Sequence, residues 1–244
     1  MYGRNYAGNT LSFEPSGGLM NASLVMQDKQ TDTYWSIMSG KAEAGALAGT
    51  RLEELPVGKK TTWAEWVAEH PDTLVLSVTR RTREGGTVRL QDPGSDAYGD
   101  YFAAAEGFRG AEATDTRLET KAPIHAFLHD GVPYAIELGR VAGGKAYELD
   151  DGTHVFIFRV ASDEVFRGSA AFVSPVGFER RGNTWVELAT GAEFDAERRD
   201  FYGGSVLERA RYYVGGSGPV ERLNGFDTFW YTWSLTHEDT KLLR

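Results

Sequence analysis

The sequence predicts a mainly β fold, at the margin of the α+β class, built from two related units. Each unit is expected to be an antiparallel sheet or partly closed barrel that carries one short helix with two tryptophans. Three observations predict this: short β-prone runs separated by turn signals, 29 glycines among 244 residues, and a tryptophan motif that occurs twice. Glycine weakens helix interiors and supplies turns, so a high glycine content favours many short strands.

The first half of the chain reads as short strands joined by turns. The β-prone runs 11–14 and 19–28 flank Ser16-Gly17-Gly18, which is a turn signal. A third run, 33–38, ends at Ser39-Gly40. These runs are the expected strands of the first antiparallel unit.

The clearest helix is predicted at residues 62–69. Thr62 can cap its amino end, and Glu65 stands three residues later, which is the spacing of a capping box. Pro71 follows and ends the helix. After it, strands are predicted at 74–79 and 87–90.

The middle and second half of the chain differ in pattern. Residues 91–121 are rich in Gly, Ala, Asp and Glu without a clean period, which predicts a surface excursion or linker with a short helix near 102–106. Beyond them, Asp130-Gly131 and Asp150-Asp151-Gly152 predict two hairpins. Further strands are predicted at 165–167, 170–173 and 184–189, and a helix at 229–236. We therefore expect a first repeat unit at 1–90, a linker at 91–121 and a second repeat unit at 122–244.

The repeat itself rests on the pattern W-x-x-W-x-x-x-H-x-D-T, which occurs at 63–73 and again at 230–240. Upstream, Trp35 followed by Ser39-Gly40 is echoed by Trp185 followed by Thr190-Gly191. Tryptophan is rare, so two tryptophans, a histidine and an Asp-Thr pair in register favour two copies of one fold. A solenoid would need at least three short units.

Each copy of the motif places two tryptophans and a histidine on one helix face, because positions i, i+3 and i+7 point the same way. The six candidate ligand-binding residues are Trp63, Trp66, His70, Trp230, Trp233 and His237. They could form a stacking platform with the histidine as an acid or base. Core packing is the more common use of tryptophan, so both interpretations stay open.

The candidate metal ligands are His125, His129 and His154. In a strand, His125 and His129 would stand about 13 Å apart, too far to share one ion. His154 could approach from a neighbouring strand together with an aspartate of 150–151. The chain has no cysteine, which excludes thiolate metal sites and disulfides, and the leading prediction is that no metal or other cofactor is used.

Acid pairs offer a possible enzymatic site. Glu53-Glu54, Asp150-Asp151 and Glu193 with Asp195 could act as glycosidase carboxylates, although the sequence does not set their separation. Solvated loops are the more common setting for such charges. The glycine-rich stretches lack phosphate-loop spacing, and no Gly-x-Ser-x-Gly motif occurs.

Residues 10–90 resemble a widespread prokaryotic family, domain of unknown function 3179. The resemblance is carried by Leu24-Val25-Met26-Gln27-Asp28-Lys29-Gln30-Thr31, Trp35, Gly40, Gly45, Gly49, Leu52-Glu53-Glu54-Leu55-Pro56, Thr62-Trp63-Ala64-Glu65-Trp66 and His70-Pro71-Asp72-Thr73-Leu74-Val75-Leu76. It continues more weakly through 96–101, 132–149 and 185–243. It implies a duplicated, β-rich protein, often exported, without an established activity.

Members of that family usually carry, ahead of the strand at residue 11, a His-Glu-x-Val-Asn-Asp stretch and a Cys-Pro-x-Cys-like stretch. This chain has neither, so their chemistry is not carried over. We expect the first repeat to lack its leading strands, which would expose backbone groups and an apolar face. The predicted function is a non-enzymatic structural or binding module that assembles with itself or with a partner chain, and the alternative is an enzyme with paired carboxylates near an aromatic groove.

Composition limits the other classes. A net charge of −9 argues against nucleic-acid binding. No apolar run approaches the roughly 20 residues of a membrane-spanning helix, and residues 1–10 do not read as a signal peptide. The family resemblance favours an extracytoplasmic location.

Overall fold

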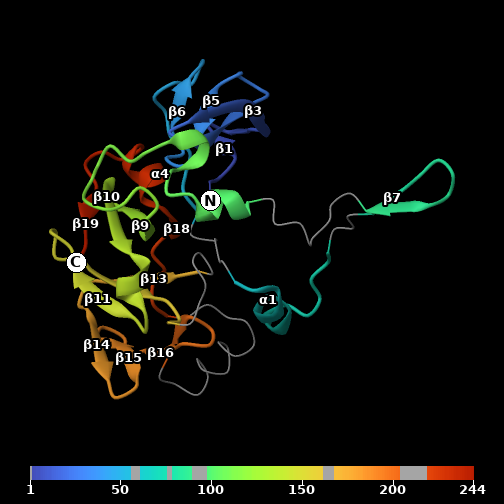
Figure 1. The fold of residues 1–244 in the computed structure, drawn as a ribbon. Helices are drawn as coiled ribbons and strands as arrows, with labels where there is room; N and C mark the ends of the chain where they lie inside the picture. Colours follow the sequence, from blue (N-terminus) through green and yellow to red (C-terminus); the bar gives the residue numbers. More distant parts are fainter. Residues whose placement is uncertain (1, 56–60, 76–78, 90–97, 162–167, 204–218) are drawn as a thin grey trace. The chain divides into compact units, whose positions relative to one another are not determined.

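The computed structural model describes residues 2–55, 61–75, 79–89, 98–161, 168–203 and 219–244. It confirms the mainly β prediction, with several antiparallel sheets and, among these residues, three short α-helices. None of the sheets formed by the described residues closes into a barrel, so the open-sheet form of the prediction holds. The chain divides into two compact units, 1–60 together with 106–244, and 61–105 (Figure 1).

The amino-terminal part of the larger unit is a four-stranded sheet of order β3-β4-β5-β6 (Figure 1, blue). It is preceded by a two-stranded ribbon. The bounds are β1 Asn5–Tyr6, β2 Asn9–Thr10, β3 Phe13–Met20, β4 Ser23–Asp28, β5 Tyr34–Ser36 and β6 Ala42–Ala44. The antiparallel strands expected in this part of the chain are therefore confirmed, although their bounds differ, and the core of the sheet contains Leu11, Trp35, Ala42 and Leu52.

One predicted turn in this sheet is wrong. Residues 16–18 lie inside β3, where the pairing with β4 shifts register between Pro15 and Leu19. The chain reverses instead at Asn21-Ala22, whose φ angles of 51° and 58° are both left-handed. Two left-handed residues match the twist of a tight hairpin, while the small residues 16–18 accommodate a bulge.

A second sheet forms the middle of the larger unit, in the order β18-β9-β10-β19. The bounds are β9 Pro123–His129, β10 Val132–Glu137, β18 Gly225–Phe229 and β19 Lys241–Leu242. Asp130-Gly131 forms the predicted hairpin turn, with φ angles of 49° and 78°. The sequence did not indicate β18 or β19, and β19 pairs with β10 in parallel.

Two further sheets complete the larger unit, in the orders β11-β12-β13 and β14-β15-β16-β17. The bounds are β11 Lys145–Glu148, β12 His154–Phe158, β13 Ala170–Ser174, β14 Phe178–Arg181, β15 Thr184–Glu187, β16 Glu193–Asp195 and β17 Asp200–Tyr202. Short 3-10 helices lie at Phe108–Gly110 and Leu138–Val141. Phe156, Phe172, Phe194 and Phe201 make the aromatic core between these sheets. The strand predicted at 165–167 lies outside the described residues.

Two turns in different sheets share one hydrogen-bond pattern. Gly40 donates to the Ser36 carbonyl and Gly191 to the Glu187 carbonyl, both at 2.9 Å. The residue after each glycine repeats the pattern. The Lys41 amide donates to the Ser39 hydroxyl, and the Ala192 amide donates to the Thr190 hydroxyl. When Gly40 is aligned with Gly191, Trp35 falls opposite Val186. Trp185, the predicted equivalent of Trp35, therefore lies one position too early.

The smaller unit, 61–105, contains α1 Trp63–Glu69, β7 Thr79–Arg81, β8 Thr87–Arg89 and α2 Gly99–Ala103. The predicted capping box is confirmed, because Thr62 accepts from the Glu65 amide and the Glu65 carboxylate accepts from the Thr62 amide. The short helix expected near 102–106 lies three residues earlier. Within the described part of the chain, no helix has both the length and the apolar character needed to cross a membrane.

Candidate functional site

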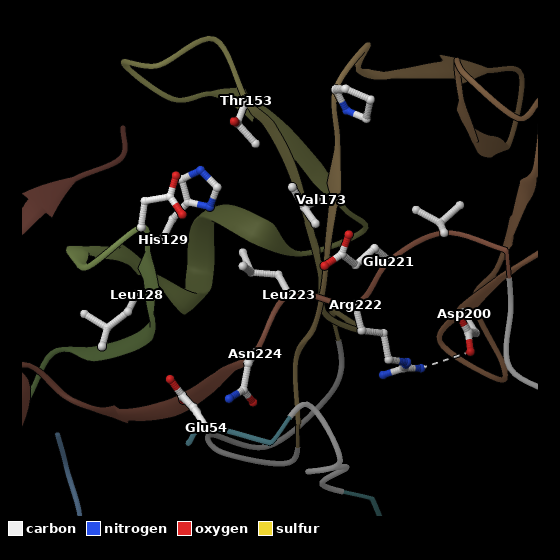
Figure 2. Close-up of a pocket in the computed structure, with 13 residues that line it drawn as sticks. Glu54, Leu128, His129, Thr153, Val173, Asp200, Glu221, Arg222, Leu223 and Asn224 are labelled. Atoms are coloured by element: carbon white, nitrogen blue, oxygen red, sulfur yellow. Dashed lines mark ion pairs between the residues drawn. The ribbon is translucent and has the colours of Figure 1, made fainter. Parts of the chain in front are cut away.

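The larger unit contains a pocket of about 860 Å³ (Figure 2). Segments from several parts of the chain form its wall: Glu54, the end of β9 with the turn after it, the loop before β12, β13 with the residues after it, β17 and the segment 220–224. The lining residues are Glu54, Leu128, His129, Asp130, Thr153, Val173, Pro175, Asp200, Val220, Glu221, Arg222, Leu223 and Asn224. Ligand pockets in proteins commonly have about 300–1,000 Å³.

The segment 220–224 is held beside β13 by backbone hydrogen bonds. The Val173 amide donates to the Glu221 carbonyl at 3.0 Å, and the Leu223 amide donates to the Ala171 carbonyl at 2.9 Å. An isolated antiparallel bridge joins Phe172 to Arg222 between them. These bonds place a polar, charged run of side chains along one wall of the pocket.

The charge of the pocket is predominantly acidic. Its single arginine, Arg222, is already engaged, with Nη2 3.3 Å from Oδ2 of Asp200 and 2.9 Å from the Arg199 carbonyl. The Arg222 guanidinium also lies over the Phe172 ring, 5.1 Å from its centroid. Apart from Arg222, the described lining residues include no lysine or arginine, whereas Glu54, Asp130 and Glu221 add three further carboxylates to the lining.

Glu54 is the carboxylate whose pKa is most informative. Burial raises its pKa above the ordinary value, and the opposing influence of Arg51 and of the Asn224 amide does not cancel this effect. Figure 2 shows Glu54 beside Asn224. The Asn224 amide nitrogen is buried and has no hydrogen bond of normal geometry to the described residues. It therefore influences the Glu54 carboxylate without forming a full hydrogen bond.

His129 lies at another side of the pocket, next to Thr153 (Figure 2). Its Nε2 atom is 2.9 Å from Oδ2 of Asp151, while Oδ1 of the same carboxylate accepts from the Thr153 amide at 2.9 Å. One ligand atom from each of His129, Asp130 and Asp151 lies within 4.8 Å of the other two.

The other two candidate metal ligands are elsewhere. His125 shares β9 with His129, but its Nδ1 pairs with Asp227 at 2.8 Å, and both side chains are 2% exposed. The Nε2 atom of His125 has no hydrogen-bond partner among the described residues. His154 lies on β12 opposite Glu148 and Ser174, outside the group that contains His129.

The tryptophans of the second motif are in the core. Helix α4, Trp230–Ser234, is shorter than the predicted helix, and Trp230 and Trp233 are buried against Ile124, Ala126 and Met38. The His237 ring packs against the Trp233 ring at an interplanar angle of 40°, with centroids 4.1 Å apart. Burial, helped by Arg51, lowers the pKa of His237 to about 4. None of the three lines the pocket.

The first motif has the same local geometry in a different environment. The His70 ring packs against the Trp66 ring at an interplanar angle of 43°, with centroids 4.2 Å apart. The His70 amide donates to the Trp66 carbonyl, just as the His237 amide does to that of Trp233. Trp63, by contrast, is 59% exposed. Trp66 Nε1 donates to Thr73 at 2.9 Å, whereas Trp233 Nε1 has no partner among the described residues.

Sequence reasoning missed most of the pocket. Of the predicted acid pairs, only Glu54 lies on its wall. Glu193 instead accepts from the Tyr202 hydroxyl at 2.7 Å, and Asp195 caps a turn by accepting from the Glu197 and Arg198 amides. Glu221, Arg222 and Asn224 belong to no motif, and the run 220–224 does not alternate apolar and polar residues, so the sequence contains no signal for an extended segment.

Comparison with known proteins gives one match. A family model described as "Protein of unknown function (DUF3179)" matches residues 1–240. No curated protein and no solved structure gives a significant match.

Proposed function

The chain belongs to the DUF3179 family, whose function is unknown, and from this premise we propose that it is a non-enzymatic binding module whose pocket takes an amphipathic organic cation. The observation that carries the proposal is the lining of the 860 Å³ pocket. Three carboxylates in a lining whose one arginine already pairs with Asp200 attract positive charge and disfavour anions. The ligand class is a protonated amine on an aliphatic chain, as in a diamine or a lysine side chain.

The aliphatic part of the ligand has its own complement. The apolar lining residues are Leu128, Val173, Pro175, Val220 and Leu223. An alkyl chain buried against them gains about 25 cal/mol for each Å² of apolar surface removed from water. A lysine-like group uses both surfaces at once, because its stem is apolar and its head is charged.

Titration calorimetry with 1,4-diaminobutane tests this proposal. We expect saturable binding whose affinity falls about tenfold in Glu221→Gln and in Glu54→Gln. Each variant loses one charge-assisted hydrogen bond to an ammonium group, and such a bond contributes roughly 1.5–3 kcal/mol. The matched control is Glu238→Gln, which removes an exposed carboxylate outside the pocket. Equal binding of succinate, a dianion of similar length, would contradict the proposal, as would unchanged affinity in both pocket variants.

An enzyme is the second candidate function. The direction of the Glu54 pKa shift favours it, because burial stabilises the protonated form of the carboxyl group, and a general acid acts from that form. However, none of the described lining residues is aromatic, which does not fit the expected aromatic groove. Turnover of a small substrate that is lost in Glu54→Gln would favour the enzyme over the binding module.

We further propose that the chain assembles with a second copy through an open sheet edge. Within the described residues, β3 pairs only with β4, and Leu19 on β3 is 43% exposed. Light scattering after size exclusion should therefore give a dimer or larger species, and Leu19→Lys should shift it to monomer, because charge on an edge strand blocks pairing. Leu188→Lys is the control, since Leu188 is equally exposed but lies off β3. A monomer at high concentration would contradict the assembly.

The duplication and the extracytoplasmic location stay predictions. Superposition of the two motif segments would check the duplication, and cell fractionation would check the location.

A further inference from the structure

A group of potential metal ligands lies where two hairpin turns meet at the rim of the pocket. His129 ends β9, Asp130 follows it in the turn, and Asp151 comes from the loop between β11 and β12. Their three nearest ligand atoms lie within 4.8 Å of one another. Imidazole nitrogen and carboxylate oxygen are both common ligands of divalent transition metals.

The spacing of these atoms matches a coordination sphere. The Nε2 atom of His129 and Oδ2 of Asp151 are 2.9 Å apart. Two ligands about 2.1 Å from an ion are about 3.0 Å apart when they stand at right angles and about 4.2 Å apart when opposite. One ion can therefore reach all three residues through side-chain adjustments alone.

The backbone already holds the ligands in place. His129 pairs with Val132 across the turn, and Asp130 occupies the left-handed region at φ 49°, which aspartate tolerates better than most residues. The Asp151 carboxylate is oriented by the Thr153 amide, which bonds the oxygen that does not face His129. Such an outer hydrogen bond is the usual device that orients a metal-binding carboxylate.

The neighbouring Asp150 is engaged in a different contact. Its carboxylate pairs with the ammonium group of Lys241 on β19, and it is not among the three residues whose ligand atoms converge. Asp150 and Asp151 are therefore adjacent carboxylates with different partners, which provides a matched pair for an experiment.

We propose that His129, Asp130 and Asp151 bind one divalent transition cation, with Zn²⁺ or Mn²⁺ as the fitting ions. Because both Asp151 oxygens accept, the His129 contact requires a proton on Nε2. Nε2 can coordinate the ion in the neutral tautomer whose proton is on Nδ1, so the ion replaces the hydrogen bond between Nε2 and Asp151 with one metal–ligand bond to each residue. With three protein ligands, the remaining coordination positions open toward the pocket, since His129 and Asp130 line it.

Titration calorimetry of tag-free, chelator-treated protein with Zn²⁺ and with Mn²⁺ tests the site. We expect one ion per chain for at least one of the two metals. His129→Ala and Asp151→Asn should each weaken metal binding more than about 100-fold. Loss of a residue that only hydrogen-bonds to a metal ligand costs roughly 10–100-fold, and these two variants remove a ligand itself. Asp150→Asn removes the same charge one residue away and should leave the affinity within about twofold.

Three results would overturn the proposal: no stoichiometric binding of either metal, unchanged binding in both ligand variants, or an equal loss in Asp150→Asn. Thermal melting of each variant without metal shows whether a loss reflects unfolding. Because Glu54→Gln removes no ligand, it should bind metal as the unchanged chain does. Its response therefore separates failure of the metal site from failure of the cation pocket.

Discussion

Replacing Trp230 by alanine is expected to lower the free energy of unfolding by about 3–5 kcal/mol, the range for a large aromatic side chain removed from a core. Trp230 is fully buried and packs with Ile124, Ala126 and Trp233. Its indole N–H also donates to the Asp115 carbonyl at 2.7 Å. The substitution therefore leaves both a cavity and a carbonyl that has lost its partner. Urea denaturation followed by far-ultraviolet circular dichroism measures the change.

The motif supplies its own control, because Trp63 occupies the same motif position in helix α1 and is 59% exposed. Trp63→Ala should change the free energy of unfolding by no more than about 0.5 kcal/mol, as is usual for surface positions. Equal losses in the two variants would show that the environment around Trp63 in solution is a core environment. That result would also support a partner that covers helix α1.

The comparison of the two tryptophan motifs shows what sequence could and could not predict. The capping box at Thr62 and Glu65 was predictable, because a cap depends on residues three positions apart. The turn at Asp130-Gly131 was predictable for the same local reason. Whether a tryptophan stripe is buried depends on distant segments, such as Met38 against α4. Spacing within the motif carries no information about that contact.

The wrong turn at 16–18 has a related cause. Ser-Gly-Gly suits both a turn and a bulge, and the choice depends on which residues of β4 lie opposite. Ser16 fixes the bulge by donating from its hydroxyl to the Val25 carbonyl at 2.7 Å. Asn21-Ala22 fell inside the β-prone run 19–28, because alanine rarely adopts positive φ and so gives no turn signal, yet the chain reverses there.

The pocket was the least predictable feature. Glu54 and Asn224 are 170 positions apart in the chain and meet only because the segment 220–224 follows β13. The predicted pairing of Glu54 with Glu53 was a feature of the sequence alone. Carboxylates that face one cavity are brought together by the tertiary fold, so sequence spacing could not identify them.

Asp28 should be the polar residue on which the amino-terminal sheet depends most. It is fully buried at the end of β4, and its carboxylate accepts from the Trp35 indole N–H at 2.9 Å. It also accepts from the Gln30 amide at 3.1 Å and from the Thr31 amide and hydroxyl at 2.6 and 2.8 Å. Asp28→Ala leaves several of these donors without an acceptor, each at about 1–3 kcal/mol when buried. We expect a total loss of about 3–5 kcal/mol in urea denaturation at neutral pH.

The pH dependence of stability separates the charge of Asp28 from its shape. Burial alone would raise the pKa of Asp28, but the hydrogen bonds from Trp35, Thr31 and Gln30 outweigh burial and lower it. Because the folded-state pKa lies below the unfolded value of about 3.9, the stabilisation is complete above that pH. It is lost as the pH falls through the folded-state pKa.

Asp28→Asn keeps the shape of the side chain and one acceptor, and it removes the charge. The difference in free energy of unfolding between the unchanged chain and Asp28→Asn should therefore be constant from pH 7 to about 5 and shrink below about pH 4. Glu187 also has a lowered pKa, but it is present in both proteins and cancels from their difference. A difference that stays constant down to pH 2 would show that the carboxylate charge of Asp28 adds nothing to stability. The turn would then depend on the position of its acceptor atoms alone.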